Sequence, residues 1–257
     1  MNKNYLAKVI EGDCLTILPK FKEKSIDMIY ADPPYFLSNG GISCKGGEMV
    51  SVDKGDWDKI DSKEEMHEFN RKWIRECKRV MKDNGTIFIS GTFHNIYSVG
   101  MVLYEEGFKI LNNITWEKTN PPPNLSCRYF THSTETIIWA RKSEKVKHKY
   151  NYNLMKSLNN NKQMKDVWRG PCITKNEKKY GYHPTQKPMY LIEKMILAAS
   201  DEGDWILDPF LGSGTTSVVA SKLGRNSVGI EMDSDFINII DNRFKGEKLK
   251  CTIQKII

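Results

Sequence analysis

An apolar run at residues 26–30, Ile-Asp-Met-Ile-Tyr, has the length and β-branched character of a buried strand, and it leads into Ala31-Asp32-Pro33-Pro34-Tyr35. The two prolines stop the strand, because proline has no N–H for a sheet ladder and a fixed φ. A carboxylate, rigid carbonyl acceptors and an aromatic ring therefore follow one strand. In open α/β sheets this carboxyl end is where ligands bind.

These groups suit a planar ring that carries an amino group. The amino group donates two hydrogen bonds, which Asp32 and the Pro33 carbonyl could accept, while Tyr35 offers a stacking surface. Such acceptors favour attack by the nitrogen, because they orient its lone pair and stabilise the positive charge that develops on it. Four residues alone are equally typical of a strand-ending turn, so this interpretation needs a second element.

A second element follows at residues 208–216, Asp-Pro-Phe-Leu-Gly-Ser-Gly-Thr-Thr, after a short strand predicted at 205–207. Its small residues let the backbone approach a ligand, and the N-terminus of the helix predicted from Thr215 favours an anionic group. It is not a P-loop, since no Gly-Lys-Ser/Thr follows. Glu231 ends the next predicted strand, about 20 positions after the glycine turn, which suits contacts to ribose hydroxyls.

Together and in this order, the two elements resemble the catalytic and S-adenosylmethionine motifs of amino-directed DNA methyltransferases. The chain is similar to the β class, in which the catalytic motif comes first, from Val9 to Phe244. The resemblance implies catalytic roles for Asp32, Pro33, Pro34 and Tyr35, and S-adenosylmethionine as methyl donor without a metal. The cofactor-binding residues that we expect are Asp13, Cys14, Asp32, Lys187, Asp208, Phe210, Gly212, Ser213, Gly214, Thr215, Thr216 and Glu231.

The resemblance also implies individual roles. It places Asp13 beside the adenine of the cofactor, although a turn aspartate that caps the next helix is compatible with the same position. It places the hexapeptide from His183 to Pro188 at the methionine end of the cofactor, with Lys187 pairing with the cofactor carboxylate. For His183 itself we expect a capping role and no catalytic one.

Four runs, residues 32–39, 52–57, 94–99 and 112–141, resemble more narrowly the GATC-modifying adenine methyltransferases of DpnII-type restriction systems, especially the partner enzyme active on single strands. This resemblance implies extrusion of an adenine from DNA, stacking on Tyr35 and methylation at N6, with a restriction endonuclease as functional partner. A cytosine-N4 methyltransferase, an RNA or protein-amide methyltransferase and a non-catalytic DNA-binding module stay open as alternatives. Pairing into a homodimer is a further expectation from the class.

The alternation of strands and helices predicts a doubly wound α/β sheet. The resemblance refines this to a mostly parallel, seven-stranded class I methyltransferase (Rossmann-like) sheet in circularly permuted order. Residues 1–144 form the catalytic half, residues 145–182 a target-recognition segment, and residues 183–257 the cofactor half of the same domain. The predicted strands are 7–11, 26–30, 86–90, 109–118, 135–141, 205–207 and 226–230, before a short final strand.

Charge is concentrated in one part of the chain. Residues 141–187 hold thirteen Lys or Arg and three acidic residues, which gives this segment a net charge of +10. Since the whole chain has a net charge of +7, the other residues together carry −3. Such a segment is the electrostatic footprint of a polyanion site, although a solvated lysine-rich loop has the same composition. Basic residues interleaved with Tyr150, Tyr152, Trp168 and Tyr180 suit phosphate and base-edge contacts.

Two further loops suggest contacts to DNA. The glycine-rich residues 36–57 follow Tyr35 directly, and we expect a lid there, with Lys45 and Lys54 touching phosphate. Residues 120–130 resemble the loop that flanks the target base, where Arg128, Tyr129 and Phe130 could contact DNA or the two aromatic rings could pack under the sheet.

Location and redox state follow from what the sequence lacks. No apolar stretch approaches the roughly 20 residues of a membrane span, and the N-terminus has no signal-peptide pattern, so we expect a cytoplasmic protein. The six cysteines show no zinc-ligand spacing, which indicates reduced thiols.

Overall fold

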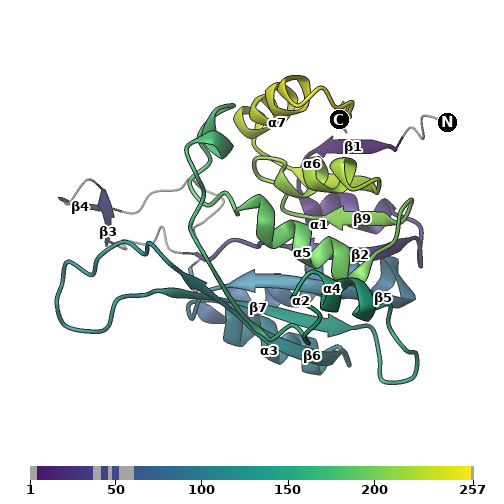
Figure 1. The fold of residues 1–257 in the computed structure, drawn as a ribbon, viewed down its shortest axis with the longest axis horizontal. Helices are drawn as coiled ribbons and strands as arrows, with labels where there is room; N and C mark the ends of the chain where they lie inside the picture. Colours follow the sequence, from purple (N-terminus) through teal and green to yellow (C-terminus); the bar gives the residue numbers. More distant parts are fainter. Residues whose placement is uncertain (1–4, 37–41, 46–47, 52–60, 256–257) are drawn as a thin grey trace.

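The computed structural model describes residues 5–36, 42–45, 48–51 and 61–255, with the backbone alone for 42–45 and 48–51. A nine-stranded sheet runs through its centre in the order β11-β1-β10-β9-β2-β5-β7-β6-β8 (Figure 1). Its strands are β1 Ala7–Glu11, β2 Ile26–Ala31, β5 Met81–Gly91, β6 Lys109–Lys118, β7 Thr134–Arg141, β8 Val167–Gly170, β9 Trp205–Asp208, β10 Asn226–Glu231 and β11 Thr252–Lys255.

Seven inner strands match the predicted set, which confirms the doubly wound, mostly parallel class. Only β7 runs antiparallel to its neighbours within this sheet. The sheet is wider than seven strands because a four-residue strand is added at each edge. The predicted final strand, β11, pairs with β1, and β8 pairs with β6 from inside the segment assigned to target recognition.

Helices cover both faces of the sheet (Figure 1). Side chains of a strand alternate between the faces, so Ile29 packs in the cluster with α2 and α3, whereas Met28 and Tyr30 pack in the cluster with α5 and α6. The helices are α1 Cys14–Ile17, α2 Lys63–Val80, α3 Ile96–Glu105, α4 Tyr152–Ser157, α5 Met189–Ala199, α6 Thr215–Lys222 and α7 Ser234–Gly246. Two 3₁₀ turns are η1 Leu18–Lys20 and η3 Asn176–Lys178. A separate hairpin consists of β3 Ile42–Lys45 and β4 Glu48–Ser51.

The sequence predicts a helix that begins at a capping box of Asp61/Ser62 and Glu65, carries Phe69 on its apolar face and ends at Asn84-Gly85. The start of this helix, α2, is confirmed and its end is wrong. The cap at Ser62 is present, since the Glu65 N–H donates to Ser62 Oγ at 3.1 Å, and Glu65 Oε2 accepts in return from the N–H of Asp61, one residue before the cap, at 3.3 Å. The helix does not run to Asn84-Gly85, because Met81 is already extended and begins β5. A register shift between β2 and β5 accommodates residues 82–85 inside the strand.

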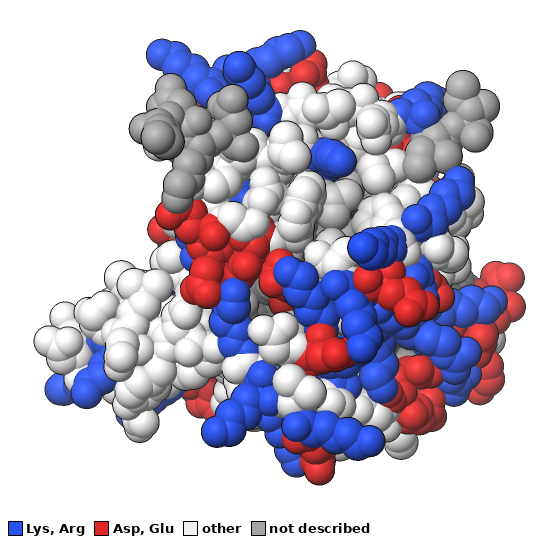
Figure 2. Space-filling view, turned by 90° about the vertical axis from the view of Figure 1, so that its right-hand side faces the viewer, with Lys and Arg blue, Asp and Glu red and all other residues white. Residues whose placement is uncertain are grey.

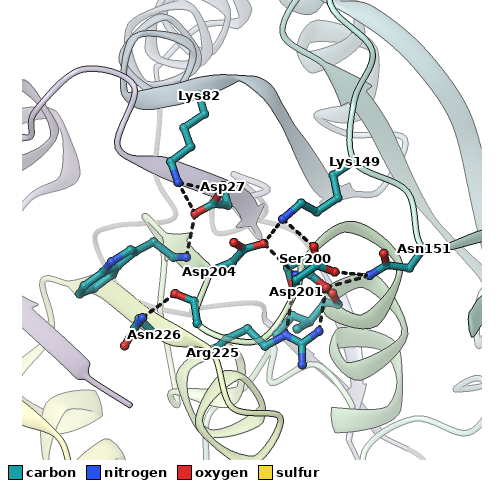
Figure 3. A network of polar contacts seen from close by, with 12 residues as sticks. Asp27, Lys82, Lys149, Asn151, Ser200, Asp201, Asp204, Arg225 and Asn226 are labelled. Atoms are coloured by element: carbon teal, nitrogen blue, oxygen red, sulfur yellow. Dashed lines mark hydrogen bonds and ion pairs between the residues drawn. The ribbon is translucent and has the colours of Figure 1, made fainter. Parts of the chain in front are cut away.

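A polar network closes the amino-terminal edge of the sheet (Figure 3). Asp27 accepts hydrogen bonds from Lys82 Nζ at 2.8 and 2.9 Å and from the Trp205 N–H at 3.0 Å, so it joins β2, β5 and β9. Lys149 pairs with Asp204, which draws the start of the basic segment onto the same edge. This edge lies opposite the carboxyl ends of the parallel strands.

Replacing Asp27 by alanine is expected to lower the free energy of unfolding by about 2 kcal/mol, because the Trp205 N–H and Lys82 both lose their acceptor. Lys24→Ala is the matched control, since it breaks a pair in which both side chains are about half exposed, and it should leave the free energy of unfolding nearly unchanged. Urea denaturation measures both values. Equal losses would contradict this role for the network.

Candidate active site

A pocket of about 370 Å³ opens at the carboxyl edge of the sheet. Four neighbouring parallel strands, β1, β10, β9 and β2, end there, so residues far apart in sequence meet. Asp32 follows β2, Asp208 ends β9 and Glu231 ends β10, and all three carboxylates line the pocket. The two sequence motifs therefore belong to one site.

Aromatic side chains form one wall of this pocket. The ring of Phe69 lies 5.6 Å from that of Phe36 and 6.1 Å from that of Phe210, and all three residues line the pocket. Trp73 packs edge-on behind Phe210 at 5.3 Å. Such a wall suits a planar aromatic ligand.

The glycine turn between β9 and α6 brings backbone up to the pocket. Gly212 and Gly214 both have positive φ, at 55° and 79°. A Cβ on Gly212 would lie 2.9 Å from His183 Nε2, and one on Gly214 would lie 3.0 Å from Ile240. The positive φ favours glycine at both positions, and the close side chains leave little room for a Cβ.

Glu231 is fixed by backbone donors. Its two oxygens accept from the Gly212 N–H at 2.7 Å and the Asp233 N–H at 2.9 Å. Burial raises the pKa of Glu231 to about 7. Burial likewise raises the pKa of Asp208 to about 7, although Thr216 Oγ1 donates to it at 2.6 Å. Each carboxylate still has lone pairs for a ligand.

Asp32 lies in a buried chain of alternating charges. Lys187 Nζ donates to Asp32 Oδ2 at 2.6 Å and lies 3.5 Å from Glu135 Oε2, while Lys118 Nζ lies 2.6 Å from Glu135 Oε1. Burial alone would lower the pKa of Lys187, but the two carboxylates outweigh it and raise that pKa. Burial would raise the pKa of Glu135, and the two lysines lower it instead. The order is thus carboxylate, ammonium, carboxylate, ammonium.

Tyr35 and Asn95 hold the Asp-Pro-Pro-Tyr turn in place. The Tyr35 hydroxyl donates to Asp32 Oδ1 at 2.7 Å, and its ring is only 7% exposed. Asn95 Nδ2 donates to the Pro34 carbonyl at 3.4 Å, and Asn95 Oδ1 accepts from the Thr92 N–H at 3.2 Å. Both oxygens of Asp32 thus have one fixed donor each and retain one acceptor direction each.

Twelve of the residues predicted for the site line the pocket. Pro33, Tyr35 and Gly214 are absent from its lining, and Tyr35 and Gly214 shape the site from behind. Asp13 lines the pocket and also caps α1, because its Oδ1 accepts from the Leu15 N–H at 3.0 Å. The lining residues among those predicted are Asp13, Cys14, Asp32, Pro34, Lys187, Asp208, Phe210, Gly212, Ser213, Thr215, Thr216 and Glu231.

Glu135, Asn95 and Phe69 were not predicted for the site. Glu135 belongs to an expected strand and Phe69 to the apolar face of an expected helix, so periodicity alone explains both. An acidic residue that opens an otherwise apolar strand was the available signal for Glu135. No local pattern marks Asn95 as a partner of Pro34, because they lie 61 residues apart.

The basic segment of residues 141–187 is not one surface. Lys149 binds Asp201 and Asp204, and Lys142 lies 3.6 Å from Asp83, all at the amino edge. Figure 2, turned toward that side, shows Lys and Arg interspersed with Asp and Glu. Trp168 is 7% exposed and packs in the core with α5, so the aromatic residues of this segment do not all lie on one surface either.

The loop of residues 120–130 stands away from the body near the carboxyl edge (Figure 1). Phe130 is 96% exposed and Tyr129 is 59% exposed, so the alternative that these rings pack under the sheet is excluded. Most of the expected lid, including Lys54, lies outside the described residues, and the side chain of Lys45 is likewise not described.

Comparison with known proteins decides what kind of site this is. The family model for DNA methylases matches residues 26–242, which include both motifs. This chain belongs to the DNA methylase family. It is 64% identical over 247 residues to the type II methyltransferase M2.DpnII of Streptococcus pneumoniae, and the aligned region covers 96% of this chain and 92% of that protein. It is 52% identical to M2.MboI of Moraxella bovis, over 95% of this chain and 88% of that protein.

Solved structures agree with this assignment. The M1.HpyAVI–SAM complex superposes with a TM-score of 0.69 at 26% identity, over 93% of this chain and 99% of that one. The cytosine-N4-specific PvuII DNA methyltransferase has a TM-score of 0.70 at 18% identity, over 98% of this chain and 96% of that one, and shares the fold. The chain is a DNA methyltransferase, and S-adenosylmethionine is its methyl donor.

The pocket fits this donor. The aromatic wall suits an adenine ring, and the fixed Glu231 carboxylate suits ribose hydroxyls, since it accepts and does not donate when ionised. In the part of the chain that the structure describes, no group of three or more His, Cys, Asp or Glu could hold a metal ion. In the same part, no helix combines the length and apolar character needed to cross a bilayer.

Binding of S-adenosylmethionine is expected to tighten about tenfold between pH 6 and pH 8. Below a pKa of about 7 Glu231 carries a proton, so one acceptor for the ribose is lost, and above it both oxygens accept. Calorimetry across this range measures the effect. Glu231→Gln should bind more weakly with a much flatter profile, and an unchanged slope in this variant would assign the titration to another group.

Proposed function

We propose that this DNA methylase transfers the methyl group of S-adenosylmethionine to N6 of adenine within GATC, as the modification enzyme of a type II restriction system. The observation that carries the proposal is Asp32, a carboxylate at the end of β2 with a fixed position and remaining acceptor capacity at the pocket. The high identity to M2.DpnII and M2.MboI supports the modification role.

Asp32 acts by receiving the amino group of the target base. Its carboxylate and the Pro33 carbonyl accept the two N–H bonds, which points the nitrogen lone pair away from them. When bound, S-adenosylmethionine supplies an electrophilic methyl group on a sulfonium. Positive charge that develops on the nitrogen lies beside Asp32, and Lys187 and Tyr35 keep that carboxylate oriented. Stacking of the adenine on Tyr35 stays a prediction.

Contacts to the DNA are assigned to the carboxyl edge. The exposed loop of residues 120–130, with Arg128, Tyr129 and Phe130, borders the target base. Within the predicted target-recognition segment, residues 171–182 and η3 lie on this side of the sheet, whereas the basic residues at 141–149 serve the opposite edge (Figure 1). We expect Lys175, Lys178 and Arg169 to contact phosphate.

The surroundings of the enzyme follow from this role. It acts in the cytoplasm on DNA, double-stranded or single-stranded, and the cognate restriction endonuclease is its functional partner. Homodimer formation is a prediction from the class.

Transfer of labelled methyl to matched oligonucleotides tests the target site. We expect label in an oligonucleotide that contains GATC and at most background in one where the same four bases are scrambled. Single-stranded and duplex forms of both should be compared at fixed salt, since binding to phosphate depends on salt. Equal label in both sequences would reject GATC and retain the methyltransferase activity.

A further inference from the structure

Arg243 on α7 is a buried cation behind the glycine turn. Its side chain is only 2% exposed, and Nη1 donates to Thr215 Oγ1 at 2.8 Å and to the Ser213 carbonyl at 3.2 Å. Nη2 is buried without a hydrogen-bond partner among the described residues. Buried polar groups are normally paired, so this nitrogen requires an explanation.

No carboxylate of the described residues lies within 4 Å of this guanidinium to balance its charge. Glu177 and Glu247 are the carboxylates whose charges act most strongly on Arg243, and each of them has another partner. Glu177 accepts from the Met189 N–H at 2.7 Å, and Glu247 lies 2.7 Å from Lys222 Nζ. A buried charge without a counter-ion is costly, and an anion brought into the adjacent pocket would compensate it.

The contact between Arg243 and Thr215 fixes the direction of a hydroxyl. A guanidinium has donors only, so Thr215 Oγ1 must accept from it, and the Thr215 proton is left to donate to Ser213 Oγ, which lies 3.4 Å away, or to a ligand in the pocket. Thr215 and Ser213 both line the pocket at the N-terminus of α6. Free backbone N–H groups and the helix dipole favour an anion at the same place.

The rest of the pocket lacks a free cation for a carboxylate. Lys187 is the one Lys or Arg in its described lining, and that ammonium already serves Asp32 and Glu135. The lining otherwise carries the carboxylates Asp13, Asp208 and Glu231. These side chains would repel a carboxylate ligand, whereas the Ser213–Thr215 turn offers it hydroxyl and N–H donors.

We infer that Arg243 is the positioning residue for the carboxylate of S-adenosylmethionine. It acts through Thr215, whose hydroxyl it turns toward the ligand, and it supplies the balancing charge from behind the turn. Lys187 is then assigned to Asp32 and not to the cofactor carboxylate. The inference concerns the methyl donor alone and does not depend on which base is methylated.

Calorimetric binding of two ligands that differ only in the carboxylate tests this inference. S-adenosylmethionine and decarboxylated S-adenosylmethionine should be titrated into the wild-type chain and into Arg243→Met, Arg243→Lys and Thr215→Val. We expect the wild type to prefer the carboxylate form by about tenfold or more, and Arg243→Met and Thr215→Val to reduce this preference to about two- to threefold. Arg243→Lys should retain most of it.

Arg225→Met is the matched control. Arg225 is also a buried arginine, 8% exposed, but it binds Ser200 at the opposite edge of the sheet, so its replacement should leave the preference unchanged. Equal weakening of both ligands in Arg243→Met would show a structural role only and overturn the inference. An unchanged preference in Arg243→Met and Thr215→Val would also overturn it, and Thr215→Val alone decides the matter if Arg243→Met does not fold.

Discussion

Asp32→Ala is expected to lower kcat by about 10³-fold while the Kd for S-adenosylmethionine changes by less than about threefold. In the proposed mechanism the carboxylate receives the amino nitrogen of the base, where charge develops in the transition state, and the cofactor contacts proposed at Glu231 and at the glycine turn do not involve Asp32. Single-turnover methylation and calorimetry measure the two quantities separately.

Two variants sharpen this test. Asp32→Asn keeps one oxygen acceptor and should fall between the wild type and Asp32→Ala. Asp201→Ala changes an aspartate at the opposite edge, where it pairs with Lys149, and should leave kcat within about twofold. Near-wild-type turnover in Asp32→Ala would show that the amino group is received elsewhere.

Lys187→Met is expected to lower kcat at pH 7 by about 10²-fold and the free energy of unfolding by about 3 to 5 kcal/mol. The substitution removes the ammonium between Asp32 and Glu135, so two buried carboxylates are left close together. One of them then takes up a proton, since like charges raise the pKa of the pair. Activity should therefore recover in part as the pH rises toward 9, because the added base removes that proton.

The controls for Lys187 separate two roles. If Lys187 serves Asp32, its replacement leaves the preference for S-adenosylmethionine over the decarboxylated form intact, unlike Arg243→Met. If it holds the cofactor carboxylate, that preference disappears while the pH profile of kcat keeps its shape. Lys162→Met, at an exposed position, should change neither stability nor kcat measurably.

Local patterns in the sequence were sufficient for most of the fold. Apolar strands and amphipathic helices have their own periodicity, so β6 was predicted with its observed ends. The helical spacing of Leu191, Ile192, Met195, Ile196 and Ala199 likewise predicts an apolar face, and all five residues are buried in α5. The end of α2 was wrong, because Asn84-Gly85 is typical of a helix end and pairing with β2 draws residues 81–85 into β5.

The site was predictable where it depends on motifs and not where it depends on strand order. Asp32, Asp208 and Glu231 end predicted strands, so a shared sheet edge brings them together. The contact of Lys187 with Glu135 depends on where β7 lies in the sheet, and the exposure of Lys149 depends on Asp204, 55 residues away. Net charge along the chain could not show that these cations are already paired.

The most direct test of the central claim is the identity of the methylated nucleoside. A duplex with a single GATC site presents both an adenine and a cytosine to the enzyme, and digestion to nucleosides after transfer of labelled methyl separates the two products. The proposed methylation of adenine within GATC, with Asp32 as the acceptor for its amino group, predicts label in N6-methyladenine alone. Label in N4-methylcytosine would contradict it.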